Sequence, residues 1–229
     1  MTEEEQGLPI ITMVEKQKRG KHRYNIFINE EYAFSVHEDI MIKHRLFKGE
    51  AIDAERMAMI IRDEERNKAY SKALYMIGRR PHASSEVKRK LKEQGFEAEI
   101  MDWVIDTLVK QNYINDEEFA KMWAEHRIYS QRRGRNWVKQ ELQQKGIQKE
   151  LVQGAIAGIN ADDELEGALK LAGNKWRITS GSTIDKKRKT GAFLMRRGYT
   201  GAIVSKVLAE LSAGTEDEEY EFYEESMDD

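Results

Sequence analysis

The amino-acid sequence predicts a mainly α-helical protein: three tandem three-helix repeats that form an elongated, curved rod, with a small antiparallel β element at the N-terminus. Three observations lead to this fold class. A helix–glycine–helix pattern occurs three times with a period near 50 residues, which is typical of stacked helical units. The 229 residues include only two prolines, so few positions interrupt a helix. Segments with strand-like alternation lie only before residue 40.

The repeated pattern is centred on a glycine between two helices. A glycine suits the left-handed conformation that commonly follows a helix C-terminus. The apolar residues after it recur at one register and give the next helix a single apolar face. Any three amphipathic helices share a period, but that does not explain a constant leucine–glycine spacing. The three copies, at offsets of 51 and 52 residues, are Leu91, Gly95 and Phe96; Leu142, Gly146 and Ile147; and Leu194, Gly198 and Tyr199.

Local signals define the elements in chain order. Alternating runs at 10–14, 24–28 and 32–36 predict a meander of two or three strands that must pack on a helix. Asp53 is a good N-cap for a long helix that runs towards Gly78. The helices of the three repeats are predicted at 68–78, 84–94 and 97–111; 116–130, 136–145 and 148–159; and 163–177, 185–197 and 200–212.

These elements divide the chain into six parts. The charged run 62–68 predicts a solvated connection between the β element and the repeats. Repeat 3 is degenerate, as end repeats often are, because Thr190 and Gly191 stand where repeat 1 has Val87 and Lys88. The predicted parts are an N-terminal extension with the β meander (1–52), a linking helix (53–69), repeat 1 (70–113), repeat 2 (114–160), repeat 3 (161–213) and an acidic, disordered tail (214–229).

The composition argues against catalysis, cofactors and membrane insertion. The chain has no cysteine, which excludes disulfides, thiolate catalysis and Cys-based zinc sites. Its five histidines lack metal-ligand spacing, and no phosphate-loop, dinucleotide or nucleophile-elbow motif occurs. No apolar run approaches the roughly 18–20 residues that span a bilayer, and the acidic N-terminus is unlike a signal peptide. We therefore predict a cytoplasmic protein that is not an enzyme and holds no metal or cofactor.

Charge is distributed unevenly along the chain. The net charge is −3, but residues 215–229 contain nine Asp/Glu and no Lys/Arg, so residues 1–214 carry +6. The body is therefore basic and the tail acidic. Most such tails only improve solubility. A sharper hypothesis is that the tail competes with a phosphate backbone for the basic residues of the body.

Basic clusters recur around the second helix of each repeat. Stacked repeats would place them along one edge as a basic stripe that suits DNA phosphates or an acidic protein groove. The alternative is that they are ordinary solvated positions on charged helices. Trp103 and Trp123 are expected in the core. Trp137 lies beside Arg133, Arg135 and Lys139 in the sequence, so it is the aromatic residue expected to contact a partner. The predicted interface residues are Arg79, Arg80, Lys88, Arg89, Arg132, Arg133, Arg135, Trp137, Lys139, Lys186, Lys187, Arg188, Arg196 and Arg197.

Three segments resemble hallmark stretches of the RecX family of bacterial regulators of the RecA recombinase. They are RRPHASSEVKRKLKEQGF, YINDEEFA and GRNWVKQELQQKGI. The resemblance is strong over residues 70–160 and weaker over 161–212. The N-terminal extension looks like that of longer family members, whereas the acidic tail lies outside the family pattern.

The resemblance implies three tandem three-helix repeats that bind the RecA–DNA filament along its groove. Proteins of this family modulate, and mainly inhibit, filament growth, DNA-dependent ATPase, strand exchange and SOS coprotease activity; some also touch DNA, and they are not enzymes. Two alternatives remain: a repeat module that acts directly on single- or double-stranded DNA, and a scaffold without a nucleic-acid role. We expect a monomer in each case. The family's basic residues correspond here to Arg79, Arg80, Lys88, Arg89, Arg133, Arg135, Lys139, Arg196 and Arg197.

Overall fold

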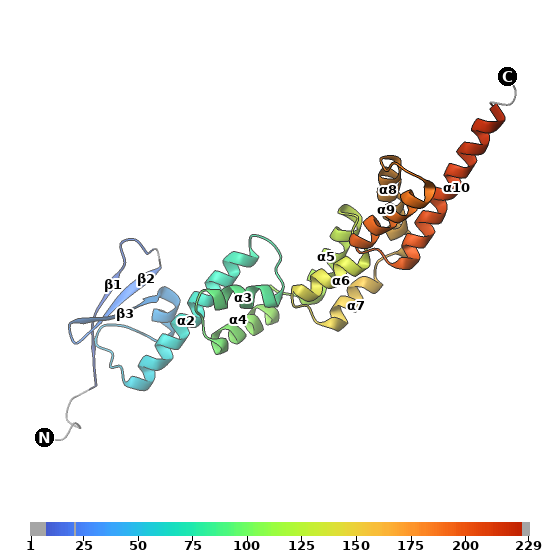
Figure 1. The fold of residues 1–229 in the computed structure, drawn as a ribbon. Coiled ribbons are helices and arrows are strands. Elements are labelled where there is room, and N and C mark those ends of the chain that lie inside the picture. Colours follow the sequence, from blue (N-terminus) through green and yellow to red (C-terminus); the bar gives the residue numbers. More distant parts are fainter. Residues whose placement is uncertain (1–7, 21, 226–229) are drawn as a thin grey trace. The chain divides into compact units, whose positions relative to one another are not determined.

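The chain forms two compact units in the computed structural model, which describes residues 8–20 and 22–225, with side chains as far as Ala213 (Figure 1). One unit comprises the chain up to Pro81 together with Val87–Ile114. The other comprises His82–Glu86 together with the chain from Asn115 onward. The first unit therefore holds the β element and most of repeat 1, and the second holds repeats 2 and 3.

A three-stranded antiparallel sheet forms the N-terminal element, which confirms the predicted meander. Ile11, Ile26 and Val36, one from each strand, are buried with Ile40 and Ile60 of the covering helices. A sheet this small is marginal alone, and these helices supply the cover that it needs. The elements are β1 (Ile11–Lys16), β2 (Arg23–Ile28), β3 (Glu31–His37), α1 (Glu38–Lys43) and α2 (Ala54–Ile77).

Helix α2 belongs to two cores. Ile60 is buried beneath the sheet, whereas Ala69 and Ala73 are buried in repeat 1. Asp53 caps its start by accepting a hydrogen bond from the Arg56 N–H at 2.7 Å, as the sequence predicts. The predicted linking helix and the first helix of repeat 1 are therefore a single uninterrupted helix of 24 residues.

The middle of α2 is not the solvated connection that the sequence predicts. Glu64 is only 4% exposed, forms an ion pair with Arg23 at 2.8 Å, and accepts the His37 N–H at 2.8 Å. The preceding residue, Asp63, lies 2.7 Å from His44. A buried carboxylate needs such partners, so the charged run of α2 holds the sheet against the helix.

Nine further helical segments complete the three repeats along the part of the chain that the structure describes. Each repeat contains three helices in the predicted order, and the last turn of α5 continues as a π-helical segment, η2. Their bounds are α3 (Ser84–Glu93), α4 (Ala98–Lys110), α5 (Asp116–Glu125), η2 (His126–Ser130), α6 (Arg135–Gln144), α7 (Lys149–Ala157), α8 (Ala161–Arg177), α9 (Thr183–Arg196) and α10 (Gly201–Glu225).

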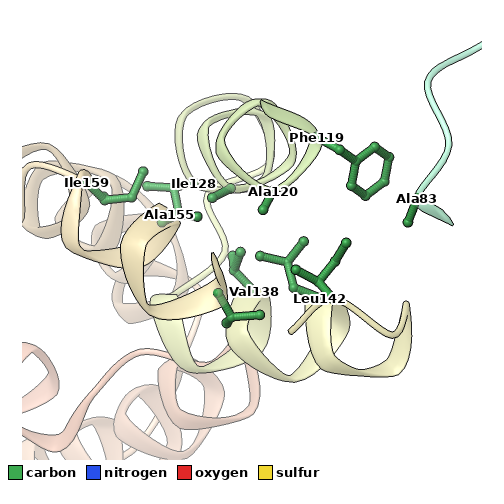
Figure 2. Packing of buried hydrophobic residues seen from close by; sticks show 11 residues of the cluster. Ala83, Phe119, Ala120, Ile128, Val138, Leu142, Ala155 and Ile159 are labelled. Carbon is green, nitrogen blue, oxygen red and sulfur yellow. The ribbon is translucent and has the colours of Figure 1, made fainter. Parts of the chain in front are cut away.

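The repeat register is confirmed in the cores. Leu91, Leu142 and Leu194 are each fully buried. Figure 2 shows the core of repeat 2, in which Phe119 lies above Leu142 of α6 and Ala83 approaches from the start of the α3 segment. Because three equivalent leucines are buried in three separate clusters, the period is a structural one.

The first helices carry a second repeat signal that the glycine alignment misses. Each holds two fully buried alanines four residues apart, which allow the other two helices to approach closely. The offset between these pairs is 51 and then 48, rather than 51 and 52, so an alignment anchored on glycine does not match them. The pairs are Ala69 and Ala73, Ala120 and Ala124, and Ala168 and Ala172.

One joint connects repeat 2 to repeat 3. The first turn of α6 lies on the glycine end of α9: the Gly134 N–H donates to the Arg197 carbonyl at 3.0 Å, and the Asn136 N–H donates to the Gly198 carbonyl at 3.1 Å. The Arg135 N–H donates to the Glu164 carboxylate at 2.9 Å. Amide groups at the start of a helix have no partner inside it, so the neighbouring repeat satisfies those of α6.

The start of α3 makes the same joint with repeat 2. The Ser84 N–H donates to the Asp116 carboxylate at 2.8 Å, as Arg135 does to Glu164. The Ser85 hydroxyl donates to the Lys145 carbonyl, next to Gly146. This docking explains why His82–Glu86 belong to the second unit.

Three predictions made from the sequence need correction or remain open. Trp103 was expected in the core but is 37% exposed, whereas Trp123 packs against the core of repeat 2 as expected. Helix α10 continues to Glu225, so residues 214–225 are helical where disorder was predicted. Glutamate is a good helix former, and the packed part of α10 supplies the nucleus for extension. Residues 226–229 lie outside the described residues, and the rod shape stays a prediction.

The joint predicts unequal costs for the same substitution at two glycines. Gly95 and Gly198 have φ of +86° and +88°, so alanine strains the backbone equally at both, by about 1–2 kcal/mol. A Cβ at Gly198 would lie 2.4 Å from Trp137, whereas none of the described atoms lies within 4 Å of one at Gly95. We expect Gly198→Ala to lose a further ~1–3 kcal/mol of unfolding free energy through overpacking.

Denaturant unfolding would measure both losses, and hydrogen exchange should place the larger loss in α6 and α9. Equal losses for Gly95→Ala and Gly198→Ala would contradict the close contact between Gly198 and Trp137 at the joint.

Candidate nucleic-acid and partner interface

The predicted interface residues of repeat 1 are exposed but engaged with neighbours. Lys88 forms an ion pair with Asp102 of α4, and Arg89 lies 3.9 Å from Glu93 one turn along α3. The Arg79 guanidinium donates to the Tyr75 hydroxyl at 3.4 Å, and Arg80 donates to the Pro81 carbonyl at 2.9 Å. Surface pairs of this kind contribute little to stability, so these cations stay accessible to a partner.

Four predicted residues from repeats 2 and 3 meet at the joint between these repeats, and we call Arg132, Arg133, Trp137 and Arg197 the joint cluster. Arg197, at the end of α9, donates to the Gln131 carbonyl at 3.1 Å. The Arg133 guanidinium lies 4.2 Å from the centre of the Trp137 ring. Residues 66 positions apart in the chain are thus brought together.

Tyr199 lies beneath the joint cluster, and the pKa of its hydroxyl is affected by the charges of the cluster. Burial raises the pKa of Tyr199 to about 12, while the positive charges of Arg197, Arg132 and Arg133 act against this rise. The phenol is therefore protonated at neutral pH and donates to the Arg132 carbonyl at 2.9 Å.

Arg135 has a different position from the rest of the set. Its guanidinium lies 2.5 Å from Glu164, whose side chain is fully buried, and its backbone N–H also donates to Glu164. Two hydrogen bonds to one buried carboxylate make Arg135 part of the joint. Its charge is balanced by Glu164, so it adds little to the field outside.

Comparison with protein families identifies the architecture. A profile described as "Regulatory protein RecX N-terminal domain" matches residues 9–53. The first, second and third three-helix domains of RecX match residues 69–108, 115–156 and 162–208, in that order.

The chain belongs to the RecX family.

Relatives named regulatory protein RecX agree with this assignment. The one from Halalkalibacterium halodurans is 33% identical over 217 residues, which cover 93% of this chain and 82% of the relative. The one from Clostridium perfringens strain SM101 is 30% identical over 205 residues, covering 88% and 96%. A crystal structure of regulatory protein RecX is 28% identical and superposes with a TM-score of 0.73 over 87% of this chain and 98% of that one. RecX from Lactobacillus salivarius, at 22% identity and a TM-score of 0.62 over 66% and 99%, supports the fold alone.

Three of the remaining predicted cations of this RecX-family chain, near the start of α9, lie away from the joint cluster. Lys186 lies 5.8 Å from the Trp176 ring, and Arg188 pairs with Asp185 at 3.3 Å, near the start of α9. Lys187 beside them is half-buried. Because α9 has 14 residues, its two ends are about 20 Å apart. Arg196 at its far end and Lys139 on α6 are exposed.

Sequence reasoning missed Glu164 and the second function of Tyr199. In the sequence, Glu164 is one carboxylate among several at the start of α8, and Tyr199 indicates only an apolar anchor position. An alignment based on the buried alanine pairs would have revealed Glu164. It places Glu164 opposite Asp116, because each lies four residues before the first alanine of its pair. Nothing in the sequence indicates that the Tyr199 hydroxyl reaches Arg132.

Neither a metal-ion site nor a membrane-spanning helix occurs among the described residues. No group of three or more His, Asp or Glu side chains there is arranged to hold a metal ion. Among these residues, no helix is long and apolar enough to cross a membrane.

The joint predicts that Glu164 is needed for stability. Glu164→Ala leaves the Arg135 amide and guanidinium without their acceptor, and we expect a loss of about 2 kcal/mol, since Arg135 is partly solvated. Glu166→Ala is the matched control: Glu166 lies on the same helix and pairs with Lys170 at an exposed position, so stability should hardly change. Urea unfolding measures both, and indistinguishable midpoints would show that the buried pair does not hold the joint.

Proposed function

We propose that this chain binds the RecA–DNA filament along its groove and mainly inhibits filament growth, with consequent loss of DNA-dependent ATPase, strand exchange and SOS coprotease activity. The observation that carries the proposal is the match to four RecX domains in order, from residue 9 to residue 208. We expect the protein to act as a cytoplasmic monomer, by binding alone, without catalysis or a cofactor.

The repeat geometry supports a periodic partner. Joints of one kind follow one another along the chain, at the start of α3 and at the start of α6. Basic loops precede both helices, at 79–80 and 132–133. Regularly spaced cations suit a filament, which presents the same acidic or phosphate-bearing surface at each step.

The joints also argue against helix-turn-helix recognition of duplex DNA, the alternative function. A recognition helix directs its N-terminal residues to base edges in the major groove. In α6 those residues are Arg135 and Asn136, whose amides are bound to repeat 3. In α3 they are Ser84 and Ser85, which are bound to repeat 2.

Recombinase ATPase on single-stranded DNA tests the proposal. We expect the protein to lower the steady-state rate, and a double charge reversal, Arg132→Glu with Lys139→Glu, to raise the half-inhibitory concentration by about tenfold, since both side chains are exposed and face solvent. Lys121→Glu, an exposed change on α5 of the same repeat, is the control. Arg135 is left unchanged because its loss would disturb the joint.

No inhibition by the unmodified protein would contradict the proposed function. Inhibition that persists undiminished in the folded double variant would exclude Arg132 and Lys139 from the contact surface. Binding to naked DNA across salt is measured in parallel, and tight binding with a slope of several phosphates would favour the direct DNA-binding alternative.

The acidic tail is proposed to compete with DNA or partner for the basic residues. Deleting residues 215–229 removes nine carboxylates, so binding should tighten at low salt and the gain should shrink as salt screens the charges. A tail of the same length with Asn and Gln in place of Asp and Glu separates charge from chain length. Unchanged affinity of the deletion variant at low salt would refute the competition.

A further inference from the structure

We propose that repeat 1 binds the N-terminal turn of a basic helix in a partner protein, on the face where repeats 2 and 3 each receive the helix start of the preceding repeat. We call Glu65, Gln94 and Gly95 the acceptor face. Its carboxylate and carbonyls attract hydrogen-bond donors and positive charge, the opposite of what the basic residues of the chain attract.

The carboxylate of the acceptor face has an equivalent in each of the other repeats. Glu65 lies four residues before the first buried alanine of α2. Asp116 and Glu164 hold the same place in repeats 2 and 3, and each accepts the backbone N–H of an incoming helix start, at 2.8 and 2.9 Å. In both internal joints this position therefore binds a helix N-terminus, whose first amides have no partner inside the helix.

The carbonyl before the repeat glycine is the second shared acceptor. In repeat 2 the Lys145 carbonyl accepts the Ser85 hydroxyl, and in repeat 3 the Arg197 carbonyl accepts the Gly134 N–H at 3.0 Å. Gln94 holds this position in repeat 1, and none of the described residues donates a backbone hydrogen bond to its carbonyl. The two internal joints thus define what the acceptor face fits: the first turn of a helix.

The charge of Glu65 is not balanced within its own helix. The cations one turn away on either side are engaged elsewhere, since Arg62 lies 3.2 Å from Glu99 and Lys68 lies 3.5 Å from Glu64. Glu65 is exposed, and no ion pair joins it to another described residue. It is therefore available to a basic side chain in the first turn of an incoming helix.

The backbone at Gly95 leaves room for such a helix. A Cβ added there would meet none of the described atoms within 4 Å, whereas at Gly198 it would lie 2.4 Å from the backbone nitrogen of Trp137 on the incoming α6. A hollow of about 630 Å³ lies beside this position between α2 and α3, with Tyr75 and Gln94 in its lining. The first repeat therefore has the same opening that α6 fills in the third.

The other second helices of this chain do not supply the partner. The starts of α3 and α6 are docked within their own chain. Helix α9 begins one turn earlier than the register requires, and its Lys186 N–H donates to the Ser182 carbonyl at 2.9 Å. A second copy of the chain thus offers no free start among these helices, so the structure favours a helix from a different protein.

The acceptor face is suited to reversible binding. Lys68 and Lys72 stand where repeat 2 has Phe119 and Trp123, which belong to or pack against its core. An incoming helix would bury less apolar surface on repeat 1 than Ala83 and its neighbours bury on repeat 2. Polar contacts supply most of the affinity, and we expect a Kd on the order of 0.1 mM for a single helix.

The test uses the full-length protein and a fluorescein-labelled peptide of residues 133–146, the segment that docks on repeat 3. A covalent link between positions 139 and 143, both exposed on α6, keeps the short peptide helical. Fluorescence anisotropy measures binding in the absence of DNA and recombinase. We expect the unmodified peptide to bind, and a peptide carrying Arg135→Ala to bind about fivefold more weakly because it lacks the basic side chain for Glu65.

Two protein variants test the acceptor face, each with a matched control. Glu65→Gln should weaken peptide binding about fivefold, whereas Glu55→Gln, an exposed position near the start of the same helix, should have no effect. Gly95→Ala should weaken binding at least tenfold, because its Cβ takes the space of the incoming backbone. Gly49→Ala is its control, since Gly49 has φ of +94° and equally open surroundings among the described atoms. Melting temperatures of all four variants are measured alongside.

Four results would overturn the proposal: no binding of the peptide up to about ten times the expected Kd, equal effects of Glu65→Gln and Glu55→Gln, equal effects of Gly95→Ala and Gly49→Ala, or undiminished binding of the Arg135→Ala peptide. Dimers of the unmodified protein in light scattering that Glu65→Gln abolishes would also overturn it, and would assign the face to a second copy. Because the assay contains neither recombinase nor DNA, its failure leaves the proposed function to its own test.

Discussion

The hydrogen bonds between one repeat's second helix and the next repeat's glycine end are the contact on which the second unit depends. In α6 the amides of Gly134, Arg135 and Asn136 all find acceptors in repeat 3. The acceptors are two carbonyls beside Gly198 and one buried carboxylate, Glu164. Such amides would otherwise be unsatisfied at a buried helix start. Gly198 therefore does more than end a helix, since its missing side chain lets the backbone of Trp137 approach.

The two ends of the repeat array explain why this joint does not continue indefinitely. At Gly95 none of the described atoms lies within 4 Å of an added Cβ, and the chain before repeat 1 is the β element rather than another repeat. At the other end, Lys187 is the register equivalent of Arg135, but α9 already begins at Thr183. Ser182 caps that extra turn by accepting the Asp185 N–H, so this amide is satisfied within its own repeat. Atypical end units of this kind are a general feature of repeat proteins.

Periodicity made most of the fold predictable, because burial repeats with the chain's own period. Leu91, Leu142 and Leu194, and the left-handed glycines after them, follow from spacing and backbone sterics alone. The burial of Glu64 did not follow from the sequence, since a charged run has the same pattern whether it faces water or Arg23. Trp103 failed for the converse reason: it has helical spacing, but its exposure depends on which neighbour covers it. Helix α10 is longer than predicted, because composition alone does not show that a packed helix can extend into the acidic segment.

The candidate site was harder to predict than the fold, because arginine has two different roles in it. Arg135 and Arg133 are two positions apart, yet the first is paired with a buried carboxylate and the second is layered on an exposed indole. Arg133 and Arg135 have different partners only because α8 and α9 pack against the loop before α6. The cluster therefore belongs to the joint rather than to either repeat, since Arg197 and Arg132 come from different repeats. A ligand that binds both must also stabilise their contact, because it binds the joined form and not the separated one. For that reason, the free energy of ligand binding at the joint cluster is coupled to the contact between repeats 2 and 3.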